Sequence, residues 1–149
     1  MKKNIENIKL IKFDYVESKL FEDALKIRTE VFVEEQNVPS ELEYDGKDPL
    51  ATHFLLLIKE KPIATARILQ KDEGIKLERF AVIKDYRGAG LGRLLMEFIT
   101  KHCNAEDIFF HSQDGAVEFY KQMGYCIIGE AFYEAGIKHY LMKHKSKIN

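Results

Sequence analysis

A glycine-rich turn in the second half of the chain constrains both the fold and the ligand. Residues 75–83 before it are strand-like, and the turn itself, residues 87–92, reads Arg-Gly-Ala-Gly-Leu-Gly. After it, apolar residues recur at helical spacing. The first N–H groups of a helix have no intrahelical partner and lie at the positive end of its macrodipole. A strand, a glycine turn and a helix start therefore predict a site for a phosphorylated ligand, to which Arg87 and Arg93 can add charge.

The spacing of the glycines excludes two common nucleotide-binding motifs. The Gly-Lys-Ser/Thr sequence of an NTPase phosphate loop is absent from the chain. From Gly88 the turn reads G-x-G-x-G, whereas the dinucleotide fingerprint is G-x-G-x-x-G and follows a first strand. The turn does match R-x-x-G-x-G, and in this it resembles the pyrophosphate-binding signature of the GNAT (GCN5-related) acyl-CoA N-acyltransferases.

Three further segments resemble the same family, in the order in which its members carry them. Residues 116–125 resemble A-x-x-F-Y-x-x-x-G-F/Y, and residues 134–142 resemble the ending E-x-G-I-P-H-x-x-M of one bacterial subgroup. Residues 27–36 resemble a segment near the start of that subgroup's members. Lys138 stands where the subgroup has proline, which leaves the backbone before His139 less constrained. The chain is identified as a member of this family over about residues 10 to 145.

The length of the chain predicts one domain, residues 1–149, and its hydrophobic patterning predicts strands that alternate with helices. A helix is expected over 18–35 with Ser18 as its cap, and residues 37–50 are expected to form a loop. The resemblance implies an α+β (mixed α/β) GNAT fold, with a mostly antiparallel twisted sheet of six to seven strands. It also implies helices on both faces of the sheet and a splay between strands four and five. Expected strands cover 8–15, 52–59, 62–70, 74–83, 108–112, 125–128 and 138–143, and further helices follow the glycine turn to residue 102 and run over 114–124.

Composition limits the partners and the compartment. The net charge is −1, and interspersed lysines and acids give no basic footprint for nucleic acid. No apolar run reaches the ~18 residues of a membrane span, and the start lacks the apolar region of a signal peptide. The two cysteines fit no metal or redox spacing. We therefore expect a cytoplasmic protein without metal, nucleic acid or membrane partners. Dimerisation is common in the family, so a homodimer is compatible with the resemblance.

The resemblance implies transfer of an acetyl group from acetyl-CoA to a primary amine of a small molecule, by direct attack in a ternary complex. Acetylation of a lysine in a protein or peptide is one alternative, and a non-catalytic acyl-CoA-binding module is another. Backbone N–H groups of the strand before the turn would meet the thioester carbonyl and pantetheine. The donor-binding residues implied are Phe80, Ala81, Val82, Arg87, Gly88, Ala89, Gly90, Leu91, Gly92 and Arg93.

Acyl transfer to an amine needs a base, because an alkylammonium group has a pKa near 10 and is mostly protonated at neutral pH. His139 is the first choice: it stands at the histidine of the subgroup's ending, and histidine titrates near neutrality. Glu78, on the strand before the turn, is the competing base. Tyr120 is the candidate acid that protonates the leaving thiolate. His53 and His111 are weaker candidates and are expected to be structural.

The acceptor pocket is expected to lie at the first predicted helix and its following loop, with Arg28, Glu35 and Gln36 as the candidate contacts. Arg28 stands among apolar residues of that helix, where a charge needs either a buried partner or an acidic group of the substrate. Glu78 would instead favour a cationic acceptor. An acceptor resembling an amino acid would satisfy both, and the sequence leaves this choice open.

Overall fold

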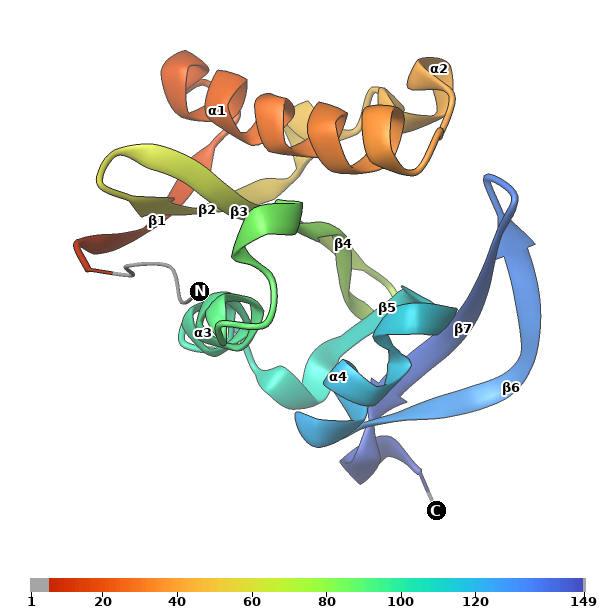
Figure 1. Cartoon of the computed structure of the whole chain (residues 1–149). Coiled ribbons are helices and arrows are strands. Elements are labelled where there is room, and N and C mark those ends of the chain that lie inside the picture. Colours follow the sequence, from red (N-terminus) through yellow and green to blue (C-terminus); the bar gives the residue numbers. More distant parts are fainter. Residues whose placement is uncertain (1–5, 149) are drawn as a thin grey trace.

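One seven-stranded sheet runs through the computed structural model, which describes residues 6–148 (Figure 1). The strand order is β1-β2-β3-β4-β5-β7-β6, and every neighbouring pair is antiparallel except β4 and β5. The mixed, mostly antiparallel fold expected from the sequence is confirmed. The strands are β1 (Ile8–Asp14), β2 (Thr52–Ile58), β3 (Lys61–Lys71), β4 (Gly74–Val82), β5 (Ile108–Gln113), β6 (Tyr125–Glu134) and β7 (Ile137–His144).

Helices cover both faces of the sheet, as expected. Figure 1 shows α1 (Ser18–Arg28) and α2 (Ser40–Glu43) on one side, and α3 (Leu91–Ile99) and α4 (Val117–Gln122) on the other. The coil of α1 continues as a π-helical segment, Thr29–Glu35, so the helical stretch ends where the sequence pattern predicts. Within residues 6–148, none of the helices combines the length and apolar character needed to cross a bilayer.

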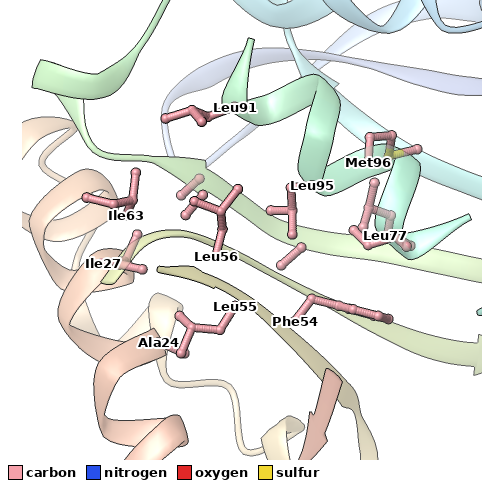
Figure 2. Close-up of a cluster of buried hydrophobic side chains, with 14 of the residues drawn as sticks. Ala24, Ile27, Phe54, Leu55, Leu56, Ile63, Leu77, Leu91, Leu95 and Met96 are labelled. Atoms are coloured by element: carbon pink, nitrogen blue, oxygen red, sulfur yellow. The ribbon is translucent and has the colours of Figure 1, made fainter. Parts of the chain in front are cut away.

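Residues 54–58 of strand β2 form a continuous apolar run because helices pack on both faces of the strand. A strand buried on both faces requires a continuous apolar run instead of an alternating one. Leu55 lies toward α1, whereas Leu56 lies toward α3 (Figure 2). The buried side chains that form this part of the core are Ala24, Ile27, Phe54, Leu55, Leu56, Ile63, Leu91, Leu95 and Met96.

The sheet splays between β4 and β5. These strands pair only at Ile75 with Ile108 and at Lys76 with Phe109, so residues 77–82 of β4 have no partner in β5. Near the same place, the register between β3 and β4 shifts, and Arg79 adopts a φ of 55°. A bulge of this kind bends a strand and strengthens its twist. The bulge therefore lies on the stretch of β4 that diverges from β5, and the expected splay between strands four and five is confirmed.

Several local expectations differ from the structure. Ser18 is the first residue of α1 and makes no capping hydrogen bond; Glu17 precedes the helix instead. The expected loop 37–50 contains α2 and a 3-10 turn, Asp48–Leu50. Strand β6 extends six residues past its predicted end at Ile128, because the chain passes through a bulge in which Gly129 has a φ of 80° and then resumes pairing with β7.

Candidate active site

A cavity of about 940 Å³ lies at the splay between β4 and β5. Its walls come from β4, the glycine turn, β5, α4, the β6–β7 hairpin and the segment that follows α1. The volume lies within the usual range for small-molecule sites, about 300–1,000 Å³. The cavity brings together these predicted site residues: Gln36, Glu78, Phe80, Ala81, Val82, Arg87, Gly88, Gly90, Leu91, Gly92, Arg93, Tyr120 and His139.

The glycine turn leads directly into α3. Gly88 and Gly90 have φ angles of 82° and 80°, in the left-handed region that glycine adopts without strain. A Cβ atom at either position would meet no other atom within 4 Å, so backbone conformation and not packing favours glycine there. The first amides of α3, from Leu91 onward, have no partner within the helix. The turn can therefore bind an anion. Of its predicted residues, only Ala89 lies outside the cavity lining.

Arg87 is held by the end of the π-helical segment. Its two terminal nitrogens lie 2.7 Å from the two carboxylate oxygens of Glu35, and its Nε donates to the carbonyl of Val82 at 2.8 Å. The Arg87 guanidinium lowers the pKa of Glu35 below its usual value. Glu35, predicted as an acceptor contact, thus lies against the glycine turn and outside the cavity lining.

The backbone of Phe80, Ala81 and Val82 forms one edge of the cavity. These residues lie beyond the last pairing of β4 with β5, so β5 satisfies none of their backbone groups. Buried backbone groups require partners. A bound ligand that carries both donors and acceptors can provide them along this edge.

His139 lies on β7, opposite Gln113 of β5 and Phe132 of β6. Its side chain lines the cavity, and the residue is 8% exposed. Its Nδ1 lies 2.7 Å from the carbonyl oxygen of Ile137. A carbonyl can only accept, so Nδ1 carries the hydrogen and Nε2 keeps its lone pair in the neutral ring. The ring also stacks on Phe132, at 6.0 Å between centroids. His139 can therefore accept a proton at Nε2.

Tyr120 is buried on α4 and reaches the same cavity. Its ring packs against Phe110 at 4.2 Å and Phe80 at 6.0 Å between centroids. Burial, with a smaller contribution from Tyr125, raises the pKa of Tyr120 above its usual value. The phenol consequently stays protonated at neutral pH and is available as a hydrogen-bond donor.

Glu78 lines the cavity but is held by two cations. Its carboxylate lies 2.5 Å from a terminal nitrogen of Arg67 and 3.0 Å from Nζ of Lys76. Burial by itself would raise the pKa of Glu78, but Arg67 and Lys76 outweigh it and hold the pKa below its usual value. A carboxylate stabilised in this way is a weaker proton acceptor than a free one.

Arg28 has the buried partners that its position requires. It is 1% exposed and lies outside the cavity lining. Its guanidinium pairs with the carboxylate of Glu43 and, at 2.8 Å, with that of Asp48. Both acids belong to the segment expected to be a loop.

These pairs belong to a larger ionic cluster of four cations and four carboxylates. The cluster joins α1, the 37–50 segment, β3 and β4, including the bulge. Burial alone would raise the pKa of Asp48, but Arg28 and Arg67 lower it below its usual value. The four positive charges equal the four negative charges, and buried ions are stable only when they are paired in this way. The members are Arg28, Arg67, Lys76 and Arg79 with Glu43, Asp45, Asp48 and Glu78.

Gln36 and Gln113 connect the two sides of the splay. Nε2 of Gln36 donates to the side-chain oxygen of Gln113 at 3.1 Å, and Nε2 of Gln113 donates back at 2.8 Å. Both residues line the cavity. The pair links the segment after α1 with the end of β5, so Gln36 lies in the cavity wall as its predicted role requires.

The sequence did not indicate a second polar pair in the cavity, His111 with Glu134. Nδ1 of His111 lies 2.7 Å from a carboxylate oxygen of Glu134, and both residues line the cavity. Glu134 is the first residue of the segment that resembles the subgroup's ending, whereas His111 was expected to be structural and instead lines the cavity. His53, in contrast, is buried against Phe13, and its Nε2 lies 3.0 Å from the carbonyl oxygen of Asp48.

Comparison with known proteins agrees with this geometry. The family model of the acetyltransferase (GNAT) domain matches residues 13–146. The N-acetyltransferase YjcF of Bacillus subtilis is 40% identical over 124 residues, which are 80% of this chain and 89% of YjcF. The crystal structure of Escherichia coli ElaA superposes with a TM-score of 0.82 at 26% identity, over 92% of this chain and 99% of ElaA. An acyl-CoA N-acyltransferase from Pseudomonas aeruginosa superposes with a TM-score of 0.81 at 25% identity, over 93% and 99% of the two chains. The chain belongs to the GNAT family and is an acyl-CoA-dependent N-acyltransferase.

Proposed function

We propose that this protein transfers the acetyl group of acetyl-CoA to a primary amine of a small molecule by direct attack. The observation that carries the proposal is the splay cavity, where an anion-binding turn, an unpaired strand edge, a histidine and a tyrosine meet. The amine nitrogen attacks the thioester carbonyl carbon, and the C–S bond breaks as the C–N bond forms. The amine loses a proton, and the leaving sulfur gains one, so no covalent enzyme intermediate is required.

The donor binds along the turn and the edge of β4. The pyrophosphate lies at Gly88, Gly90 and the start of α3, where free amides and the helix dipole favour negative charge. The pantetheine pairs with the edge of β4 that has no partner in β5. An N–H of Phe80–Val82 also donates to the thioester oxygen as it becomes negative, and such preorganised donors contribute about 2.7–4 kcal/mol each.

His139 is the general base in this proposal. Its Nε2 is free to accept a proton, and the bond from Nδ1 to Ile137 fixes the ring orientation. Glu78 is less suited, because Arg67 and Lys76 stabilise its charged form. We assign Glu78 to the ionic cluster that supports the β4 bulge.

Tyr120 completes the reaction at the leaving sulfur. Its phenol remains protonated in the buried site, so it can donate to the thiolate as the C–S bond breaks. Full proton transfer from a phenol with a raised pKa is uphill, and we therefore propose that the hydrogen bond itself stabilises the leaving thiolate, which then takes its proton from water.

The acceptor enters beside Gln36, and the Gln36–Gln113 pair limits its size. This bridge across the splay favours a small molecule over a lysine side chain presented by a folded protein. Arg28 and Glu35 have other partners, so we do not place them in the acceptor site.

A thermal melt tests the donor, and a panel of small primary amines tests the reaction. A ligand at about 100 times its Kd stabilises a protein by ~2.7 kcal/mol, or roughly 5–10 °C for a domain of this size. We expect this rise with acetyl-CoA and not with ATP, which lacks the pantetheine arm. Acetyl-CoA and an amine should then yield equal amounts of free coenzyme A and acetylated amine. Binding without turnover of any amine would instead support the acyl-CoA-binding module.

A further inference from the structure

The ionic groups that line the cavity are paired, with one exception. Each lining cation, namely Lys76, Arg79, Arg87 and Arg93, has a carboxylate partner. Two of the lining carboxylates, Glu43 and Glu78, have arginine or lysine partners. The third, Glu134, pairs only with His111, which is charged only when it is protonated. Within residues 6–148, Glu134 is therefore the cavity carboxylate that lacks a permanent cation.

One carboxylate oxygen of Glu134 has a partner, and the other is available to a ligand. One carboxylate oxygen lies 2.7 Å from Nδ1 of His111, and no partner within residues 6–148 holds the second oxygen. Phe132 packs edge-on against the His111 ring at 4.9 Å between centroids and stacks on His139. The Glu134 side chain is 47% exposed, so a ligand in the cavity can reach it without displacing a salt bridge.

We propose that Glu134, positioned by His111, binds a second cationic group of the acceptor, which is thus an amine that carries a further ammonium group. The inference rests on the proposed function, because it takes His139 as the place where the reacting amine lies. A carboxylate without a permanent cation, facing a cavity in which the other charges are balanced, favours a positively charged ligand group.

The strand register sets the spacing of the two amines. Phe132 is the ladder partner of His139, and Glu134 is the next residue of β6 on the same face. His139 and Glu134 are thus diagonal neighbours on adjacent strands, about 7–8 Å apart. The nitrogens of an extended diamine with about four or five methylenes have a similar separation. The acceptor class is consequently a diamine, or a larger amine that contains this spacing.

Steady-state kinetics with 1,4-diaminobutane and butylamine test the proposal, because the two differ in the second ammonium group. We expect wild type to prefer the diamine by tenfold or more in kcat/KM, and the preference to peak at four or five methylenes in a series of diamines. Glu134→Gln keeps the shape and removes the charge, and should lower the preference to within about twofold. Glu130→Gln removes a charge from the same strand outside the cavity lining and should keep the full preference.

Three results would overturn this assignment and leave the proposed function intact. The first is equal kcat/KM for butylamine and 1,4-diaminobutane in wild type. The second is an unchanged diamine preference in Glu134→Gln, in a variant that melts within about 2 °C of wild type. The third is acetylation of another amine of the panel while no diamine reacts. If no amine reacts at all, the proposed function is wrong with it.

Discussion

Replacing Arg28 with methionine tests whether the ionic cluster, and not the acceptor, explains this buried charge. Methionine is similar in length and fills the apolar surroundings, but it removes the cation between Glu43 and Asp48. Both acids would remain buried. Arg28→Met should therefore destabilise the fold and leave acceptor binding unchanged.

The structure sets the size of the effect. Breaking a buried ion pair costs about 3–5 kcal/mol, because the remaining charge is left without its partner. Here Glu43 keeps Arg79 at 2.7 Å and Asp48 keeps Arg67 at 2.8 Å. We therefore expect the lower end, about 3 kcal/mol, which corresponds to a fall in Tm of roughly 6–12 °C.

Thermal melts of wild type, Arg28→Met and Lys9→Met measure this loss. Lys9 pairs with Glu60 on the surface, where the lysine side chain is 55% exposed, so its removal should lower Tm by less than about 3 °C. At a temperature where both variants are folded, KM for the amine should equal that of wild type. A melt within 2 °C of wild type, together with a raised acceptor KM, would refute the cluster and make Arg28 an acceptor contact.

Three further predictions follow from the same contacts. The pKa values of Asp48 and Glu78 are lowered in the folded state, so their contribution to stability is full above about pH 5 and is lost as pH falls below ~4. Tm measured from pH 7 to 3 should therefore stay level and then drop. A steady Tm down to pH 3 would contradict this. In Glu35→Gln the side chain at position 35 no longer competes as an anion with the donor's pyrophosphate for Arg87, so calorimetry should show acetyl-CoA binding that is tighter by a few-fold. Weaker binding would show that Glu35 helps to position Arg87. Tyr120→Phe should lower kcat by about 10²-fold, the usual effect of losing one preorganised hydrogen-bond donor, with an unchanged Kd for acetyl-CoA. An unchanged kcat would remove Tyr120 from the mechanism.

The sequence predicted the strands and the glycine turn because their signals are local. The apolar run of β2 and the glycines that adopt positive φ angles at positions 88 and 90 can each be recognised from a few consecutive residues. The bulge at Gly129 was missed because a glycine and polar residues within a strand resemble a strand end.

The side-chain partnerships could not be predicted in the same way. Arg28 contacts Glu43 and Asp48 only because the 37–50 segment folds back toward α1. The composition of that segment predicted a loop and did not indicate these contacts. His111 on β5 contacts Glu134 on β6 across β7, which lies between these two strands although it follows both in the chain. Such pairs depend on topology, which a single sequence does not express locally.

Acetyl transfer by a His139→Gln variant is the most direct measurement of the central claim. With the amine that wild type acetylates fastest, the formation of acetylated amine and free coenzyme A is followed at saturating acetyl-CoA. We predict that the variant binds acetyl-CoA with the wild-type Kd and that its kcat falls by about 10²–10⁴-fold, the usual contribution of a general base. A variant that binds the donor normally and turns over at the wild-type rate would contradict the role of His139 in this cavity.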